Sequence, residues 1–133
     1  MVLENTYEFL NEMEYGNVPK KEVLCKGERD GYEYFIVSYG THPCAYVVLP
    51  LKHTLNSVEV DSEMDNYVNV HGGVTFLKNH LLNHRYGDRK VIGWDYNHYN
   101  DQYGNVILTG VKYRTVNLLW DVMECIDDLE NYS

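Results

Sequence analysis

The chain has 133 residues, with 11 Lys and Arg against 20 Asp and Glu, which gives a formal net charge of −9. This length is typical of one domain, so we expect a single domain over residues 1–133. The excess of acid argues against a protein that binds duplex nucleic acid by broad charge neutralisation. A hydrophobic fraction of 44% and an aromatic fraction of 14% exclude a disordered chain.

The cysteines and the N-terminal stretch indicate a cellular compartment. Cys25, Cys44 and Cys125 are odd in number and too widely spaced for a disulfide framework or a paired-cysteine zinc motif. The first residues lack the basic region and apolar run of a signal peptide, and no stretch approaches the ~18 apolar residues that span a bilayer. We therefore expect a cytoplasmic protein without a membrane partner.

The first half of the chain predicts a short helix followed by a β-hairpin. Residues 5–16 fit a helix, because Asn5 and Glu8 suit a capping box and a glycine follows the apolar positions. Residues 32–39 and 44–49 are rich in β-branched and aromatic side chains and are separated by turn residues, which is typical of paired strands. The polar segment 51–66 is expected to be mainly loop.

The second half predicts short strands and one long helix. Residues 67–70 and 91–95 are strand candidates, and 78–90 is basic and polar. From residue 116 to about residue 130, apolar residues recur with a period near 3.6, and Thr115 suits an N-cap; the apolar positions are Val116, Leu119, Trp120, Met123, Ile126 and Leu129. These elements indicate an α+β fold, a mainly antiparallel sheet with a short N-terminal helix and a long C-terminal amphipathic helix packed on it.

Three stretches concentrate residues that could bind a ligand. The first carries His42 and Cys44 and is followed by His53; the second is His71-Gly72-Gly73 with Thr75; the third contains Trp94, Asp95, Tyr96 and His98, with Asp101 after it. We expect the three stretches to converge on one cavity, whose ligand-binding residues are His42, His53, His71, Gly72, Gly73, Thr75, Trp94, Asp95, Tyr96 and His98.

The Gly72-Gly73 pair and the third stretch each allow two interpretations. Two glycines permit positive φ, and their amides can form a nest for a phosphate or carboxylate, although such a pair is also common in structural turns. His71, Asp95 and His98 suit a divalent metal ion, with Asp101 and His98 as catalytic groups, but their spacing matches no established metal motif. The leading interpretation therefore has no cofactor, and a divalent metal ion is the alternative.

The segment 78–90 is the most basic part of this acidic chain. It could neutralise a phosphate, or it could be a solvated surface. Tyr86 and Trp94 lie in or beside it, and either could stack on a ring or belong to the core. Cys44 has His42 two residues away as a possible base, but a cysteine in a strand is more often a small buried hydrophobe.

The three stretches together resemble a family of small uncharacterised proteins of bacteriophages and prophages. The matching residues are His42, Cys44, Tyr46, Val47, Pro50 and His53, then His71, Gly72, Gly73, Thr75 and Phe76, then Gly93, Trp94, Asp95, His98 and Asp101. Ala45 stands where that family often has Gly, and Asn97 stands where it often has a small residue. The resemblance covers roughly residues 32–130 and implies a phage setting, with the host cytoplasm as the place of action.

Three functions are compatible with these residues. The leading hypothesis is a non-enzymatic protein that sequesters a small phosphorylated nucleotide-derived ligand, by analogy with phage proteins that capture immune signalling nucleotides. The first alternative is a metal-dependent hydrolase of a phosphoester or related bond. The second alternative is an interaction protein that inhibits a host protein through its acidic surface. A homodimer is the default expectation for so short a chain.

Overall fold

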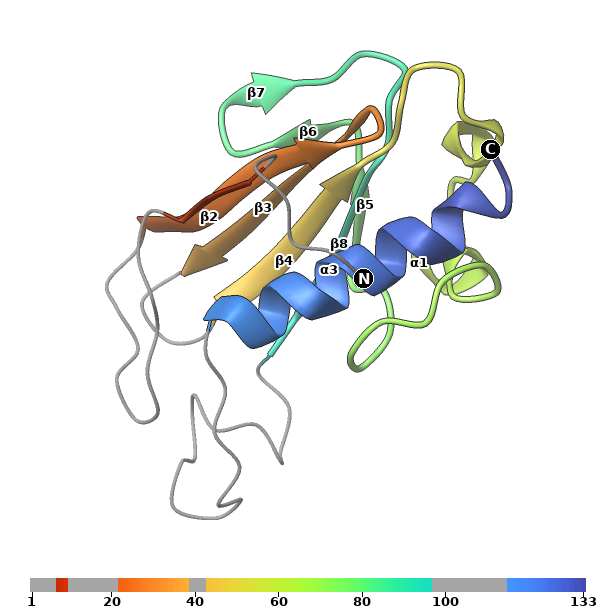
Figure 1. Cartoon of the computed structure of the whole chain (residues 1–133). Helices are drawn as coiled ribbons and strands as arrows, with labels where there is room; N and C mark the ends of the chain where they lie inside the picture. Colours follow the sequence, from red (N-terminus) through yellow and green to blue (C-terminus); the bar gives the residue numbers. More distant parts are fainter. Residues whose placement is uncertain (1–6, 10–21, 39–42, 97–114) are drawn as a thin grey trace.

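The computed structural model describes residues 7–9, 22–38, 43–96 and 115–133, and they form an antiparallel sheet with one long helix across it (Figure 1). The sheet has six strands in the order β1-β2-β3-β4-β8-β5. Their bounds are β1 Tyr7–Phe9, β2 Glu22–Arg29, β3 Tyr32–Ser38, β4 Pro43–Val48, β8 Val91–Asp95 and β5 Phe76–Lys78. The architecture is α+β, as the sequence predicts.

The remaining elements are short apart from the C-terminal helix. A separate two-stranded ribbon consists of β6 (His80–Leu81) and β7 (His84–Arg85). A 3₁₀ turn, η1 (Thr54–Ser57), and one helical turn, α1 (Asp61–Met64), lie within the segment expected to be loop. The helix α3 (Thr115–Glu130) follows the expected bounds, and none of the described helices is long and apolar enough to cross a membrane.

Side chains of the sheet alternate between two faces, because successive residues of a strand point to opposite sides. The inner face, covered by α3, carries Ile36, Val47 and Trp94 among many buried residues. The outer face carries a smaller cluster that includes Tyr46 and Leu81, the latter from the β6–β7 ribbon. The central hairpin pairs β3 with β4 as predicted, with Tyr34 opposite Val47.

The apolar face of α3 is rotated relative to the sequence prediction. Its buried residues are Leu118, Leu119, Val122, Met123, Cys125, Ile126 and Leu129. Trp120, expected in the apolar stripe, is 37% exposed, which corrects that expectation. The helix ends on acidic residues, and two of them have partners that offset the unfavourable helix dipole. Asp127 forms an ion pair with Arg29 at 2.5 Å, and Asp128 accepts a hydrogen bond from the Asn69 amide at 3.0 Å.

Two other local predictions were wrong. Tyr7–Phe9 forms strand β1 beside β2 instead of the expected N-terminal helix, whose other residues lie outside the described ranges. Residues 67–70 form no strand and lead into the turn at Gly72. In both places pairing and packing with distant parts of the chain override the local propensity.

Candidate functional site

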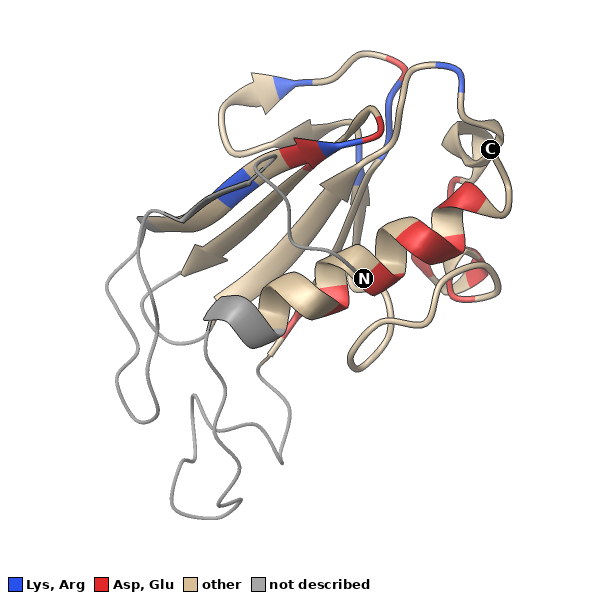
Figure 2. Cartoon of the chain, viewed as in Figure 1, with Lys and Arg blue, Asp and Glu red and all other residues tan. Residues whose placement is uncertain are grey.

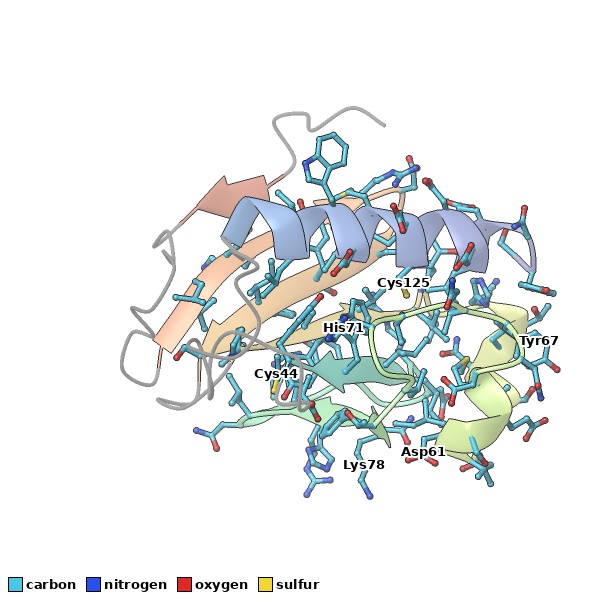
Figure 3. All side chains as sticks on the ribbon, turned by 90° about the horizontal axis from the view of Figure 1, so that it is seen from below. Cys44, Asp61, Tyr67, His71, Lys78 and Cys125 are labelled. Atoms are coloured by element: carbon cyan, nitrogen blue, oxygen red, sulfur yellow. The ribbon has the colours of Figure 1, made fainter. Side chains whose placement is uncertain are left out.

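A buried polar cluster joins β8 to α3. The Trp94 indole donates to the Tyr96 hydroxyl at 3.0 Å, and that hydroxyl donates to Asp121 Oδ2 at 2.6 Å. The His71 ring stacks on the Tyr96 ring, with centroids 4.7 Å apart and planes 17° apart. Figure 3 places His71 between α3 and the sheet. The structure therefore brings together His71, Trp94 and Tyr96 of the predicted site.

The cluster does not leave its aromatic rings available to a ligand. Tyr96 is 0% exposed and Trp94 is 1% exposed, so neither ring can form the open stacking wall that the sequence suggested. Burial raises the pKa of Asp121, while the Tyr96 hydrogen bond and the nearby His71 lower it in part. The result is a helix carboxyl held against the sheet, which packs as part of the core.

Asp121 was missed in the sequence, although a signal was present. It follows Leu118 by three residues and precedes Cys125 by four, so it shares a helix row with two fully buried side chains. A carboxylate in such a row needs a polar partner across the interface. Tyr96 provides that partner.

The Gly72-Gly73 turn does hold a carboxylate, but the carboxylate belongs to the chain itself. Gly72 and Gly73 have φ of 71° and 86°, which suits glycine. The Gly73 amide donates to the Val70 carbonyl, and the Val74 amide donates to Asp65 Oδ1 at 2.7 Å. A Cβ on Gly73 would lie 3.3 Å from Asp65 Oδ2. The Gly73 amide is therefore used within the turn, and the Asp65 carboxylate lies against Gly73 in the space where a ligand anion was expected.

Asp95 is separated from His71 by the sheet. It follows Trp94 and precedes Tyr96, both on the inner face, so its side chain points to the outer face. There it raises the pKa of Cys44, its opposite residue in β4. The expected metal pair of His71 and Asp95 therefore does not converge. Within the described residues no group of three His, Cys, Asp or Glu side chains is placed to hold a metal ion.

His53 has a structural place. It is 6% exposed, and its Nδ1 accepts from the Leu55 amide at 3.0 Å while Nε2 lies 2.9 Å from the Leu129 carbonyl oxygen. Because Nδ1 accepts, Nε2 carries the proton and donates to Leu129. Both ring nitrogens thus serve to join η1 to the end of α3, and neither is left for a ligand.

Four further predicted residues lie apart from the cluster or outside the described ranges. Thr75 is exposed and lines a recess of about 300 Å³ with Asp61 and Lys78. Figure 3 shows Lys78 on the side of the sheet away from α3. His42, His98 and Asp101 lie outside the described residues.

Cys44 is poorly suited to nucleophilic catalysis. Burial raises the pKa of its thiol to about 11, with a further rise from Asp95 and an opposing effect of a hydrogen bond with Tyr46. The thiolate is the reactive form of cysteine, and at neutral pH a thiol of this pKa is almost wholly protonated. Cys25 and Cys125 are also buried, and burial raises the pKa of Cys125 as well.

The basic segment divides into two structural cations and an exposed ribbon. Arg89 donates to the Leu49 carbonyl at 2.7 Å and pairs with Glu33 at 2.9 Å. Lys90 is 6% exposed and donates to the Asn56 carbonyl at 3.1 Å. In contrast, His80, His84 and Arg85 are exposed on the β6–β7 ribbon.

This ribbon covers a cavity of about 570 Å³ on the outer face of the sheet, which we call the hairpin cavity. Residues of β2 and β3 line one side of it, and residues 81–84 together with Tyr86 line the other. The side chains most relevant to binding are Lys26, Glu33, Phe35, Leu81, His84 and Tyr86. The cavity was not foreseen from the sequence, since its walls come from two segments about fifty residues apart in the chain.

The hairpin cavity combines aromatic rings with one lysine, Lys26, which lies opposite Glu8 in the β1–β2 pairing. Tyr86 packs edge-on against His84, with centroids 4.4 Å apart, and the Arg89 guanidinium lies 5.7 Å from the Tyr86 ring centre. Glu33, the carboxylate in the lining, is neutralised by Arg89. Among the described residues, neither Lys26 nor Arg85 has an ion-pair partner.

Figure 2 shows where the charged residues of the described chain lie. Helix α3 carries acidic residues and no Lys or Arg, whereas the described Lys and Arg residues lie on the strands, the β6–β7 ribbon and the loops near them, where acidic residues such as Glu28, Glu33 and Asp88 also lie.

Comparisons of the chain with protein-family models, curated proteins and solved structures found no match. The resemblance to phage proteins rests on the motif residues alone.

Proposed function

We propose that the chain is a binding protein that captures a small phosphorylated ligand with a flat ring, of the nucleotide-derived kind, in the hairpin cavity. The observation that carries this proposal is a cavity lined by Phe35 and Tyr86, with the unpaired cation Lys26 at its edge, in a chain of net charge −9. Excess acid elsewhere makes a local basic and aromatic cavity informative, because its positive charge is not a property of the whole surface.

The dimensions and chemistry of the cavity suit such a ligand. A volume of about 570 Å³ lies within the roughly 300–1,000 Å³ typical of small-molecule sites. Phe35 and Tyr86 are half-buried, so each keeps part of a ring for a flat ligand group. Stacking of a base on an aromatic side chain contributes about 1–3 kcal/mol. Burial raises the pKa of Tyr86, with a further rise from Glu33, so its hydroxyl remains protonated and can donate a hydrogen bond.

The described residues favour a protein that binds its ligand without catalysing a reaction on it. The buried Cys44 thiol is not activated, and His71 and Asp95 point to opposite faces of the sheet. The metal-dependent hydrolase therefore depends on His98 and Asp101, which lie outside the described residues. In the phage setting that the motifs suggest, capture in the host cytoplasm would sequester an immune signalling nucleotide.

Isothermal titration with nucleoside monophosphates, cyclic nucleotides and ADP-ribose-type compounds tests the proposal. Heat release of any ligand that co-purifies with the protein gives a second, independent readout. We expect at least one compound to bind with a micromolar or lower Kd, and Phe35→Ala to weaken it about tenfold, which corresponds to about 1.4 kcal/mol.

Leu51→Ala is the matched control, because Leu51 is 59% exposed and does not line the cavity. It should bind like the wild-type chain. Failure of every compound to bind, or equal affinity of Phe35→Ala and wild type, would refute the proposal.

One observation favours the second candidate, an interaction protein that inhibits a host protein. The exposed side of α3 presents Trp120 one turn before Glu124, and α3 carries no basic residue (Figure 2). An exposed Trp among acidic groups suits a basic protein surface. A photo-crosslinking residue at position 120 should then give one defined host adduct that is absent when the same residue replaces Leu51.

A further inference from the structure

Two recesses meet at the tip of the β6–β7 ribbon. The hairpin cavity lies between the ribbon and the sheet, and a second recess of about 340 Å³, here called the tip recess, lies against the ribbon itself. Leu82, Asn83 and His84 line both. Because three consecutive residues form the common boundary, a ligand seated in the cavity needs to cross only one turn of chain to reach the tip recess.

The two recesses differ in chemistry. The hairpin cavity contains the aromatic rings of Phe35 and Tyr86 and the apolar Leu81. The tip recess adds His80 and Arg85, and no carboxylate lines it. Imidazole, amide and guanidinium groups are hydrogen-bond donors that suit a phosphate, and a guanidinium can bind one with two parallel hydrogen bonds.

Leu82, on the boundary between the two recesses, has an unusual backbone conformation. Its φ is 55°, a left-handed value that is uncommon for any residue other than glycine, asparagine or aspartate. It occupies a two-residue turn between β6 and β7, where glycine is the favoured residue at such a φ. Its side chain is also 52% exposed, so core packing does not account for a leucine here. Residues held at such φ values cluster at ligand-binding and active sites, and Leu82 lies on the rim of both recesses.

We infer that the ligand is bipartite and spans this boundary, with its ring in the hairpin cavity against Phe35 and Tyr86 and its phosphate in the tip recess on Arg85. This inference rests on the proposed function and makes it specific. The ligand class is a nucleoside phosphate, in which a flat base and a phosphate are joined by a sugar, and Leu82 packs on the linking part. The phosphate supplies a large share of the affinity, because Arg85 has no ion-pair partner among the described residues.

Paired titrations test the inference. Adenosine, guanosine, cytidine and uridine, their 5′-monophosphates and inorganic phosphate are titrated against wild type, Arg85→Gln and Lys52→Gln. Lys52 is exposed and lines neither recess, so its variant controls for the loss of one positive charge. We expect at least one monophosphate to bind tenfold or more tightly than its nucleoside in wild type and in Lys52→Gln.

Arg85→Gln should abolish this preference, leave the nucleoside affinity unchanged and reduce the salt dependence of binding. Equal binding of nucleoside and monophosphate, or an unchanged preference in Arg85→Gln, overturns the inference and leaves the proposed function standing. Inorganic phosphate that binds as tightly as the monophosphate also overturns it, because the ring then contributes nothing. If neither nucleosides nor monophosphates bind, this inference is overturned. If the cyclic nucleotides and ADP-ribose-type compounds also fail to bind, the proposed function is refuted as well.

Leu82→Gly separates binding from folding. Glycine relieves the backbone strain, so the melting temperature of the variant should not fall, while loss of the leucine side chain should weaken monophosphate binding several-fold. A variant that binds like wild type would remove Leu82 from the site and, with it, the bridging geometry.

Discussion

Substitution of Gly93 by alanine tests how closely the outer face of the sheet is packed. Gly93 lies in β8 opposite Tyr46 of β4 on one side and Phe76 of β5 on the other. A Cβ at this position would lie 2.6 Å from Tyr46 Cδ1 and 2.9 Å from Phe76 Cβ. Both distances are shorter than the 3.0 Å below which real Cβ contacts essentially never occur, so something has to move.

Neither neighbour of Gly93 can move freely. The Phe76 Cβ is attached directly to the backbone, so it shifts only if β5 shifts. The Tyr46 ring is 5% exposed and packs edge-to-face on Phe76, with centroids 5.3 Å apart. Overpacking of this kind costs about 1–3 kcal/mol, and disruption of the ring pair adds about 0.5–1.5 kcal/mol. The lower chain entropy of alanine offsets about 0.5–1 kcal/mol, so we expect Gly93→Ala to lower the free energy of unfolding by about 0.5–4 kcal/mol.

Urea unfolding followed by tryptophan fluorescence measures this loss, since Trp94 is buried beside the substituted position. The sharper measurement is a double-mutant cycle with Tyr46→Leu, which removes the ring atoms that the new Cβ would meet. The double variant should recover at least about 1 kcal/mol relative to the sum of the single variants. Costs that simply add to within about 0.5 kcal/mol, or a Gly93→Ala variant as stable as wild type, would show that the ring does not set the requirement for glycine.

Four further predictions follow from the described contacts. Tyr32→Phe should leave the free energy of unfolding unchanged or raise it by about 1 kcal/mol in urea unfolding, because the buried Tyr32 hydroxyl has no hydrogen-bond partner among the described atoms. Burial raises the pKa of Asp121 above the ordinary value of 3.8, so wild-type stability should fall as pH rises from that value through the folded pKa, and Asp121→Asn should remove this fall in a pH series of unfolding curves. Asp65→Ala should cost about 1.5–3 kcal/mol in denaturant unfolding by removing the charged acceptor of the Val74 amide, with a smaller cost for Asp65→Asn. The expected homodimer should sediment at twice the 15.6 kDa chain mass, and a species at the chain mass over the accessible concentration range would refute it.

The sequence predicted those strands and helices whose local residue pattern matches the place they take in the fold. Strands β3, β4 and β8 are runs of β-branched and aromatic residues, and α3 has a clear helical period. Strand β2 was not identified because it contains charged residues and a glycine. Its strongest signal lay in the adjoining turn, where Asp30 and Gly31 have φ of 52° and 86° and join β2 to β3.

The candidate site residues were harder to predict than the strands and the helix. Sequence spacing selected His71, Trp94 and Tyr96, which the structure brings together, but it could not assign residues to a face of the sheet. A shift of one residue along a strand reverses the face, so Asp95 lies away from the residues on either side of it. The hairpin cavity could not be predicted from the sequence. Its lining comes from β2 and β3 and from the ribbon, segments about fifty residues apart that only the folded chain brings together.

Most motif residues that can be located serve the fold, and this shapes where a ligand can bind. Gly93 makes room for the Tyr46 ring, Gly73 accommodates the Asp65 carboxylate, and His53 ties η1 to α3. Each of these groups satisfies a partner within the chain, so a ligand would have to displace an existing contact to use it. Arg85 on the ribbon and Lys26 on β2 instead have no ion-pair partner among the described residues. An anion gains most where a cation is unpaired and an exposed ring adjoins it, and in the described chain the hairpin cavity and tip recess combine these conditions.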